Sequence, residues 1–169
     1  MQTQIETPDG VFIVTFSEHG LTRLEFPAVE RTCAQQCATG NLPPKTERWH
    51  AMTVRAVVDI LAGRTPTALP PLDFSIGTDF QKSVWAAISQ IGLGQTQTYG
   101  QIAASIGKPL AVRAVGRACG ANPVPVLVPC HRVLPKSGGM GGFSCGSEWK
   151  RRLLAREGIL CPAPGAARK

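Results

Sequence analysis

The chain has 169 residues, of which 43% are hydrophobic and 17% charged, and its formal net charge is +7. This balance excludes an intrinsically disordered chain. The sequence has no run of about 18 apolar residues, so no transmembrane helix is predicted. After Asp79 the only acidic residues are Glu148 and Glu157, so the basic excess lies in the second half. Such an excess suits a nucleic-acid backbone, with a generically basic protein as the alternative.

The N-terminus and the cysteines indicate the cellular compartment. The first residues, MQTQIETPDGVFIV, lack the basic and apolar segments of a secretory signal. Six cysteines are spread along the chain, as expected of free thiols in a cytoplasmic protein. Cys33 and Cys37 would need further ligands, such as His19 or His50, to hold a metal ion, and we predict no metal site.

The first half of the chain predicts two strands and a helix. Residues 11–26 form two strands around the turn SEHG, because β-branched and aromatic residues dominate both arms. Residues 46–62 repeat apolar side chains at helical spacing, and Gly63 ends this helix. The segment RTPTALPPLDFSIG predicts a linker, so we divide the chain into domains of residues 1–75 and 76–169.

The second domain is predicted to be mainly helical and to contain a helix-turn-helix. Thr78 is the expected N-cap of its first helix. In residues 99–120, two apolar stripes on either side of GKP predict two short helices joined by a tight turn. Arg113 and Arg117 lie on the face that the second stripe leaves free, where contacts to DNA would lie. An ordinary amphipathic hairpin with solvated arginines is the alternative.

The last predicted helix, residues 147–157, places a carboxylate on its apolar side. Glu157 follows Trp149 and Leu153 at helical spacing, so its side chain is expected to point inward. A buried carboxylate needs a partner, and a histidine would serve. The alternative is that Glu157 curls into water at a frayed helix end.

Cys130 and His131 stand side by side in PVPVLVPCHRVLPKSGG. A thiol attacks as its thiolate, so Cys130 needs a base, a cation or a helix dipole nearby. Side chains of adjacent residues diverge, so proton transfer to His131 requires an intervening water or a sharply turned backbone. Glu157 behind His131 would complete a Cys/His/Glu relay, and Asn122 is a candidate to pin the turn through its amide.

These residues resemble the O6-alkylguanine-DNA alkyltransferase (methylated-DNA–protein-cysteine methyltransferase) family. Its signature PCHR stands at 129–132, and further matching segments follow in order: GTDFQKSVWAAI, TYGQIAASIGKPLAVRAVGRACG, ANPVPVLVPCHRV and KRRLLAREG. The resemblance covers residues 76–160 well and the N-terminal part loosely. It implies an α+β fold, with a small N-terminal α/β domain of the ribonuclease H-like type before a mainly helical, winged-helix-like DNA-binding domain.

The resemblance also implies direct-reversal DNA repair by a suicidal methyltransferase that needs no cofactor. Cys130 would accept the alkyl group of O6-alkylguanine in duplex DNA after base flipping, with O4-alkylthymine left open as a second substrate. His131, through a water, and Glu157 would take the thiol proton. Asn122 would hold the turn, and Tyr99 would donate to N3 of the base.

The DNA contacts implied by the resemblance lie in the minor groove. Arg113 would enter the duplex in place of the flipped nucleotide, with Arg117 and the small Ala114 beside it. The base pocket would be lined by Pro125, Val133, Phe143, Ser144 and Cys145. Phe143 and Cys145 depart from the tyrosine and glycine frequent in the family, which leaves the size of the pocket open. We expect a monomer, with cooperative binding on DNA left open.

Two other functions stay open on the sequence. Relatives with tryptophan in place of the nucleophile bind alkylated lesions without transferring anything, and Cys130 argues against that function. A cysteine hydrolase using Cys130, His131 and Glu157 would need an oxyanion hole and multiple turnover.

Overall fold

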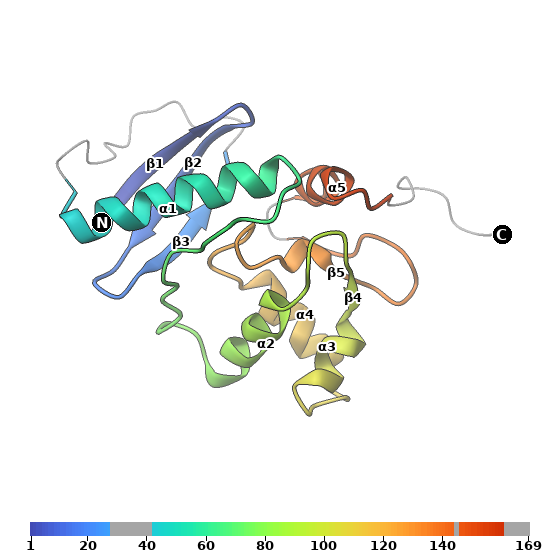
Figure 1. The fold of residues 1–169 in the computed structure, drawn as a ribbon. Helices are drawn as coiled ribbons and strands as arrows, with labels where there is room; N and C mark the ends of the chain where they lie inside the picture. The colour runs from blue at the N-terminus through green and yellow to red at the C-terminus, as the bar shows by residue number, and fades with distance from the viewer. Residues whose placement is uncertain (28–41, 144–145, 161–169) are drawn as a thin grey trace.

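Three antiparallel strands form a sheet at the N-terminal end of the chain (Figure 1). The computed structural model describes residues 1–27, 42–143 and 146–160. The strands lie in sequence order: β1 (Gln2–Thr7), β2 (Gly10–Phe16) and β3 (Leu21–Glu25). The predicted hairpin of residues 11–26 is confirmed as β2 and β3. The sequence analysis missed β1, because Ile5 is the only buried residue of this polar strand.

Helix α1 (Pro44–Leu61) packs against the sheet and closes the first hydrophobic core (Figure 1). Alternate side chains of β2 meet helically spaced side chains of α1 in this core, among them Phe12, Val14, Phe16, Trp49, Val57 and Ile60. The same core includes four residues of the second half: Val124, Val126, Leu127 and Leu153. The division into residues 1–75 and 76–169 stays a prediction, and apolar contacts cross it.

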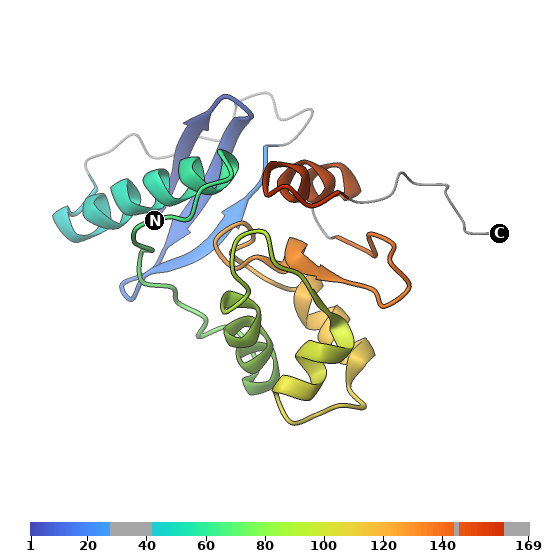
Figure 2. The ribbon, with the colours of Figure 1, turned by 45° about the vertical axis from the view of Figure 1, so that its right-hand side comes forward.

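Three helices build the second core, in the lower part of Figure 2. They are α2 (Asp79–Ser89), α3 (Tyr99–Ser105) and α4 (Val112–Gly120). The indole N–H of Trp85 on α2 donates to the carbonyl of Ala118 on α4 at 2.8 Å, which fixes these two helices to one another. The predicted helix pair in residues 99–120 is confirmed as α3 and α4.

Capping boxes fix where α2 and α3 begin. The hydroxyl of Thr78 accepts from the backbone N–H of Gln81, and the Gln81 side chain accepts from the backbone N–H of Thr78. Thr98 and Gln101 repeat the arrangement at α3. Such reciprocal bonds satisfy N–H groups that a helix start leaves without partners. The predicted N-cap at Thr78 is thus confirmed.

The chain after α4 joins the two cores. Its elements are the short 3-10 helix η1 (Cys130–Arg132), the strand β5 (Val133–Leu134) and the helix α5 (Ser147–Arg156). Strand β5 pairs in parallel with β4 (Gln97–Thr98), which lies just before α3 in the chain. Helix α5 contacts η1 and lies beside the end of the sheet in both views (Figures 1 and 2). None of the helices in the described ranges has the length and apolar character needed to cross a membrane.

Gly63 is where α1 ends and the last turn of α5 comes closest. Its φ is +69°, and a Cβ at this position would lie 2.3 Å from the carbonyl oxygen of Arg156. We therefore expect Gly63→Ala to lower the free energy of unfolding by about 2 kcal/mol or more, through left-handed strain and displacement of α5. Urea unfolding measures this change. Gly138→Ala is the control, since its φ is +81° but no atom lies within 4 Å of the added Cβ.

Candidate active site

The loop between α4 and η1 is held in a strained turn that presents Cys130. The side-chain amide of Asn122 donates to the Val128 carbonyl at 2.8 Å, and its oxygen accepts from the Val124 backbone N–H at 3.1 Å. Val126, between these contacts, has a φ of +76°, which a β-branched residue rarely adopts. The amide of Asn122 therefore pins the turn, as the sequence predicted.

The same amide reaches the nucleophile. Nδ2 of Asn122 donates to Sγ of Cys130 at 3.2 Å, and the Cys130 residue is only 3% exposed. A hydrogen bond to sulfur favours the thiolate over the neutral thiol. Asn122 thus fixes the backbone before Cys130 and donates a hydrogen bond to its sulfur.

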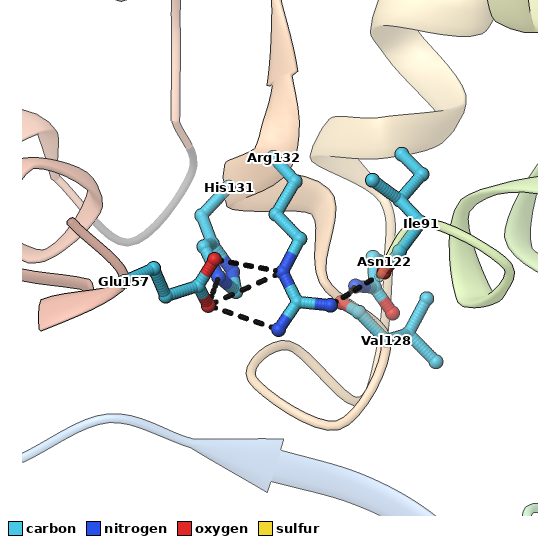
Figure 3. A network of polar contacts seen from close by, with 6 residues as sticks. All are labelled: Ile91, Asn122, Val128, His131, Arg132 and Glu157. Carbon is cyan, nitrogen blue, oxygen red and sulfur yellow. Dashed lines mark hydrogen bonds and ion pairs between the residues drawn. The ribbon is translucent and has the colours of Figure 1, made fainter. Parts of the chain in front are cut away.

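His131 and Glu157 meet behind the turn, as Figure 3 shows. Nε2 of His131 lies 2.9 Å from Oε1 of Glu157, and both side chains are completely buried. The predicted inward orientation of Glu157, with a histidine as its partner, is confirmed, and the frayed alternative is wrong. Because a carboxylate only accepts, Nε2 of His131 donates, and in the neutral ring the lone pair lies on Nδ1.

Arg132 is the second partner of Glu157, and the sequence analysis gave it no role (Figure 3). Its Nε donates to Oε2 of Glu157 at 3.0 Å and its Nη2 to Oε1 at 2.9 Å. Its Nη1 donates to the carbonyl of Ile91, just beyond the end of α2. Arg132 therefore joins η1, α5 and the chain after α2 around one carboxylate.

Burial and charge set the protonation of this group. Burial holds the pKa of His131 below its usual value, although Glu157 opposes the shift. Burial also opposes the charge on Glu157, but hydrogen bonds from His131 and Arg132 lower the pKa of this carboxyl to about 2. At neutral pH, His131 is thus a neutral base. Its Nδ1 is buried and has no hydrogen-bond partner among the described residues.

A cavity of about 500 Å³ opens next to Cys130. It is lined by residues of α3, α4, η1 and the loop before α5: Tyr99, Arg113, Gly116, Arg117, Cys119, Gly120, Cys130, Gly142 and Phe143. A larger hollow beside α1, lined by Trp49 and Met52 among others, has no cysteine among its described lining residues. The cavity beside Cys130 therefore combines two thiols, a phenol and two guanidinium groups, which suits a planar ligand that carries polar atoms.

Tyr99 keeps its proton in this cavity. Burial, together with the charges of Cys119 and Cys130, raises the pKa of Tyr99 to about 12. Its hydroxyl oxygen would lie 3.3 Å from a Cβ added to Gly141, so the loop before α5 passes close to it. Tyr99 is therefore a hydrogen-bond donor at the cavity wall at neutral pH.

The structure brings together most of the predicted site residues. Tyr99, Arg113, Arg117 and Phe143 line the cavity with Cys130, and Ala114 is half-buried on α4. Pro125 and Val133 are buried but are not among the lining residues. Ser144 and Cys145 lie outside the described residues, as do Cys33 and Cys37. The roles assigned to all of these residues stay predictions.

Two further residues near the cavity were not foreseen. Lys150 is completely buried on α5, its Nζ donates to the Val133 carbonyl at 2.8 Å, and it lies 6.0 Å from the ring centre of Phe143. Cys119 lines the cavity as well as packing in the second core. Lys150 lies one turn before Leu153 and Leu154 on the apolar side of α5, which was the available signal for its burial.

Comparison of the sequence with known proteins shows the family of this chain. The family model described as "6-O-methylguanine DNA methyltransferase, DNA binding domain" matches residues 79–159. A methylated-DNA–protein-cysteine methyltransferase of Methanosarcina barkeri is 35% identical over 159 residues, covering 90% of this chain and 94% of the relative. The chain belongs to this family. The resemblance drawn from PCHR and its flanking segments is confirmed.

Solved structures of methyltransferases of this family share the fold. The crystal structure of Mycobacterium tuberculosis OGT in complex with DNA has a TM-score of 0.75 and 35% identity, covering 92% of this chain and 91% of that one. The methyltransferase of Pyrococcus kodakaraensis has a TM-score of 0.65 and 25% identity, covering 94% and 100%. A small sheet followed by a helical part is thus the fold of this methyltransferase family, as predicted.

One relative is a much longer protein. The regulatory protein Ada of Salmonella typhimurium is 47% identical over 104 residues, which is 62% of this chain but 29% of Ada. The shared part of this methyltransferase family therefore occurs both as most of a chain and as one section of a larger one.

Proposed function

We propose that this member of the family repairs alkylated duplex DNA by moving the alkyl group of O6-alkylguanine to Cys130, once per molecule. One observation carries the proposal: the Cys130 sulfur lies 3.2 Å from the Asn122 amide, in the same cavity as Tyr99 and Arg113. This geometry supports the proposal because the thiol of Cys130 lines the same cavity as the side chains proposed to contact DNA, Tyr99 and Arg113. Transfer from O4-alkylthymine is the second substrate to be tested.

The chemistry follows from the protonation of the site. The proton of Cys130 passes, through a water, to the lone pair on Nδ1 of His131, while Glu157 stabilises the imidazolium that forms. The sulfur attacks the alkyl carbon in line, the bond from carbon to O6 breaks, and its electron pair stays on the guanine. The Tyr99 hydroxyl donates a hydrogen bond to N3 and stabilises the leaving base. The thioether formed on Cys130 is final, and no cofactor takes part.

The alkyl carbon cannot be reached inside a stacked duplex, so the nucleotide must flip into the cavity. Arg113 takes its place in the stack, and Arg117 contacts phosphate. Ala114 and Gly116 leave α4 slim enough to enter the minor groove. Pro125, Val133, Phe143, Ser144 and Cys145 contact the flipped base. Because phosphate contacts dominate, binding weakens with salt and depends little on sequence.

The same proposal includes the finer assignment of the fold, the oligomeric state and the cellular location. The sheet with α1 is the ribonuclease H-like part, and α3 with α4 is the helix-turn-helix of a winged-helix-like part. The protein acts as a monomer in the cytoplasm. Light scattering with and without DNA tests the monomer, and cooperative assembly would appear as clusters on long duplexes.

Intact-mass measurement after incubation with an O6-methylguanine duplex tests the function. We expect one methyl group per protein, mapped to Cys130, and none in Cys130→Ser. Cys119→Ser is the matched control, because Cys119 lines the same cavity but is not the acceptor, so this variant should still gain the methyl group. Lesion binding without a mass gain would favour a non-catalytic sensor. Repair of several lesions per protein would favour a hydrolase.

A further inference from the structure

The turn between β1 and β2 reaches across to α5. Oδ1 of Asp9 accepts from Nη2 of Arg152 at 2.7 Å, and the two carboxylate oxygens accept from Nη1 and Nη2 of Arg156, both at 2.7 Å. The Asp9 side chain is only 9% exposed. In both ribbon views the tip of the β1–β2 hairpin lies at the end of the sheet that is next to α5 (Figures 1 and 2). A paired, fork-shaped contact of this kind fixes geometry as well as charge.

The contact is made one residue before the carboxylate of the active site. Glu157 is the C-cap of α5, and Arg156 is the last helical residue. Helix ends lack intrahelical partners for their last carbonyls and fray readily. Here the end is held: Asp9 binds the Arg156 side chain, and Gly63 packs against the Arg156 carbonyl.

Asp9 and Arg156 are both charged at neutral pH. The hydrogen bond from Arg156 holds the pKa of Asp9 below its usual value, and the bond to Asp9 raises the pKa of Arg156. Asp9 is therefore ionised at neutral pH. Neutralising it removes the ion pair without removing side-chain volume.

We propose that Asp9 is a positioning residue for alkyl transfer: through Arg156 it holds the last turn of α5 so that Glu157 stays in contact with His131. This inference rests on the proposed function of the site. The sheet, which contributes no residue to the cavity lining, thereby takes part in the reaction by fixing the carboxylate that supports the base. Misplacing such a group by about 1 Å is enough to slow a reaction markedly.

The test compares Asp9→Asn with Asp9→Glu, which keeps the charge, in the full chain. The matched control is Asp59→Asn, which breaks the ion pair of Asp59 with Arg64 at the end of α1. We expect Asp9→Asn to slow single-turnover transfer by about five-fold per folded protein, Asp9→Glu to recover most of the rate, and Asp59→Asn to leave it unchanged.

Titration of the His131 imidazole by NMR provides a readout that does not depend on transfer. The charged groups around His131 are Glu157, Arg132 and Lys150. Loosening Glu157 removes a neighbouring negative charge, so the midpoint of His131 is expected to fall in Asp9→Asn and to stay in place in Asp59→Asn. In a plot of transfer rate against pH, the fall in rate on the acidic side should move to lower pH in Asp9→Asn, together with the His131 midpoint.

The outcomes separate the inference from the proposed function. A fall in melting temperature with an unchanged rate and an unchanged or raised His131 midpoint would overturn the role of Asp9, leaving only a structural ion pair. If the wild-type protein gains no methyl group, the proposed function fails, but the His131 titration still decides whether Asp9 positions Glu157.

Discussion

We expect Glu157→Gln to slow alkyl transfer to Cys130 by about 100-fold at pH 7 and to leave DNA affinity unchanged, since general-base assistance contributes at least this factor. The amide cannot stabilise an imidazolium, and its NH₂ group can favour the wrong tautomer of His131. Single-turnover rates on an O6-methylguanine duplex, corrected for the folded fraction, measure the loss. Glu148→Gln is the control, because Glu148 lies on the same helix but pairs with Arg151 at the surface.

The pH dependence of stability gives a second test of Glu157. Its pKa in the folded protein is about 2, below its ordinary value of 4.5. The stability that its ionisation contributes is therefore fully present above about pH 4.5 and is lost as the pH falls toward 2. The contribution of Glu157 ionisation to the stability difference between wild type and Glu157→Gln should be constant above about pH 4.5 and shrink below it. The difference also changes below the ordinary histidine pKa of 6.5, because the pKa of His131 is lower in the variant. A difference that does not change between pH 5 and pH 2.5 would contradict the assigned ionisation.

We expect Arg132→Met to lower the free energy of unfolding by about 3 to 5 kcal/mol, the range found when one partner of a buried ion pair is removed. Among the described residues, Glu157 would keep only His131 as a partner, and the Ile91 carbonyl would lose the Arg132 donor. The Arg132 charge also lowers the pKa of His131, against the effect of Glu157. Without Arg132 the His131 pKa rises, so the acidic limb of the rate profile moves to higher pH.

The direction of this shift separates the two variants. In Glu157→Gln the loss of the carboxylate charge moves the acidic limb to lower pH, whereas in Arg132→Met it moves to higher pH. Arg132→Lys keeps the charge but cannot span both Glu157 and Ile91, so it should restore the limb and only part of the stability. Unfolding in urea and rate profiles from pH 5 to 9 measure both effects. Limbs moving in the same direction would contradict the opposed roles.

The helices and the adjacent Cys130 and His131 could be predicted from the sequence because their signals are local. The capping residue Thr78, the stop at Gly63 and the two apolar stripes of residues 99–120 each act within a few residues along the chain. The adjacency of Cys130 and His131 is likewise a feature of sequence. For Glu157, helical spacing and the cost of an unpaired buried carboxylate indicated an inward orientation, with a frayed helix end as the open alternative that the structure excludes.

The strand β1 and the hydrogen-bond partner of the buried Lys150 could not be predicted from the sequence. A strand with one buried residue has no alternating pattern, and its place is fixed by pairing with β2. A lysine on a helix is expected in water, and Lys150 is buried because the Val133 carbonyl, distant in sequence, gives it a partner.

The sequence by itself determined which residues are the candidates for the chemistry, since PCHR, the helix pair and the spacing to Glu157 are features of the chain itself. Only the tertiary structure decided how that chemistry is tuned. Arg132 reaches both Glu157 and the Ile91 carbonyl, and Asp9 reaches Arg156, because folding brings together segments that are far apart in sequence. Charge interactions depend on distance and burial, and neither exists until the chain has folded.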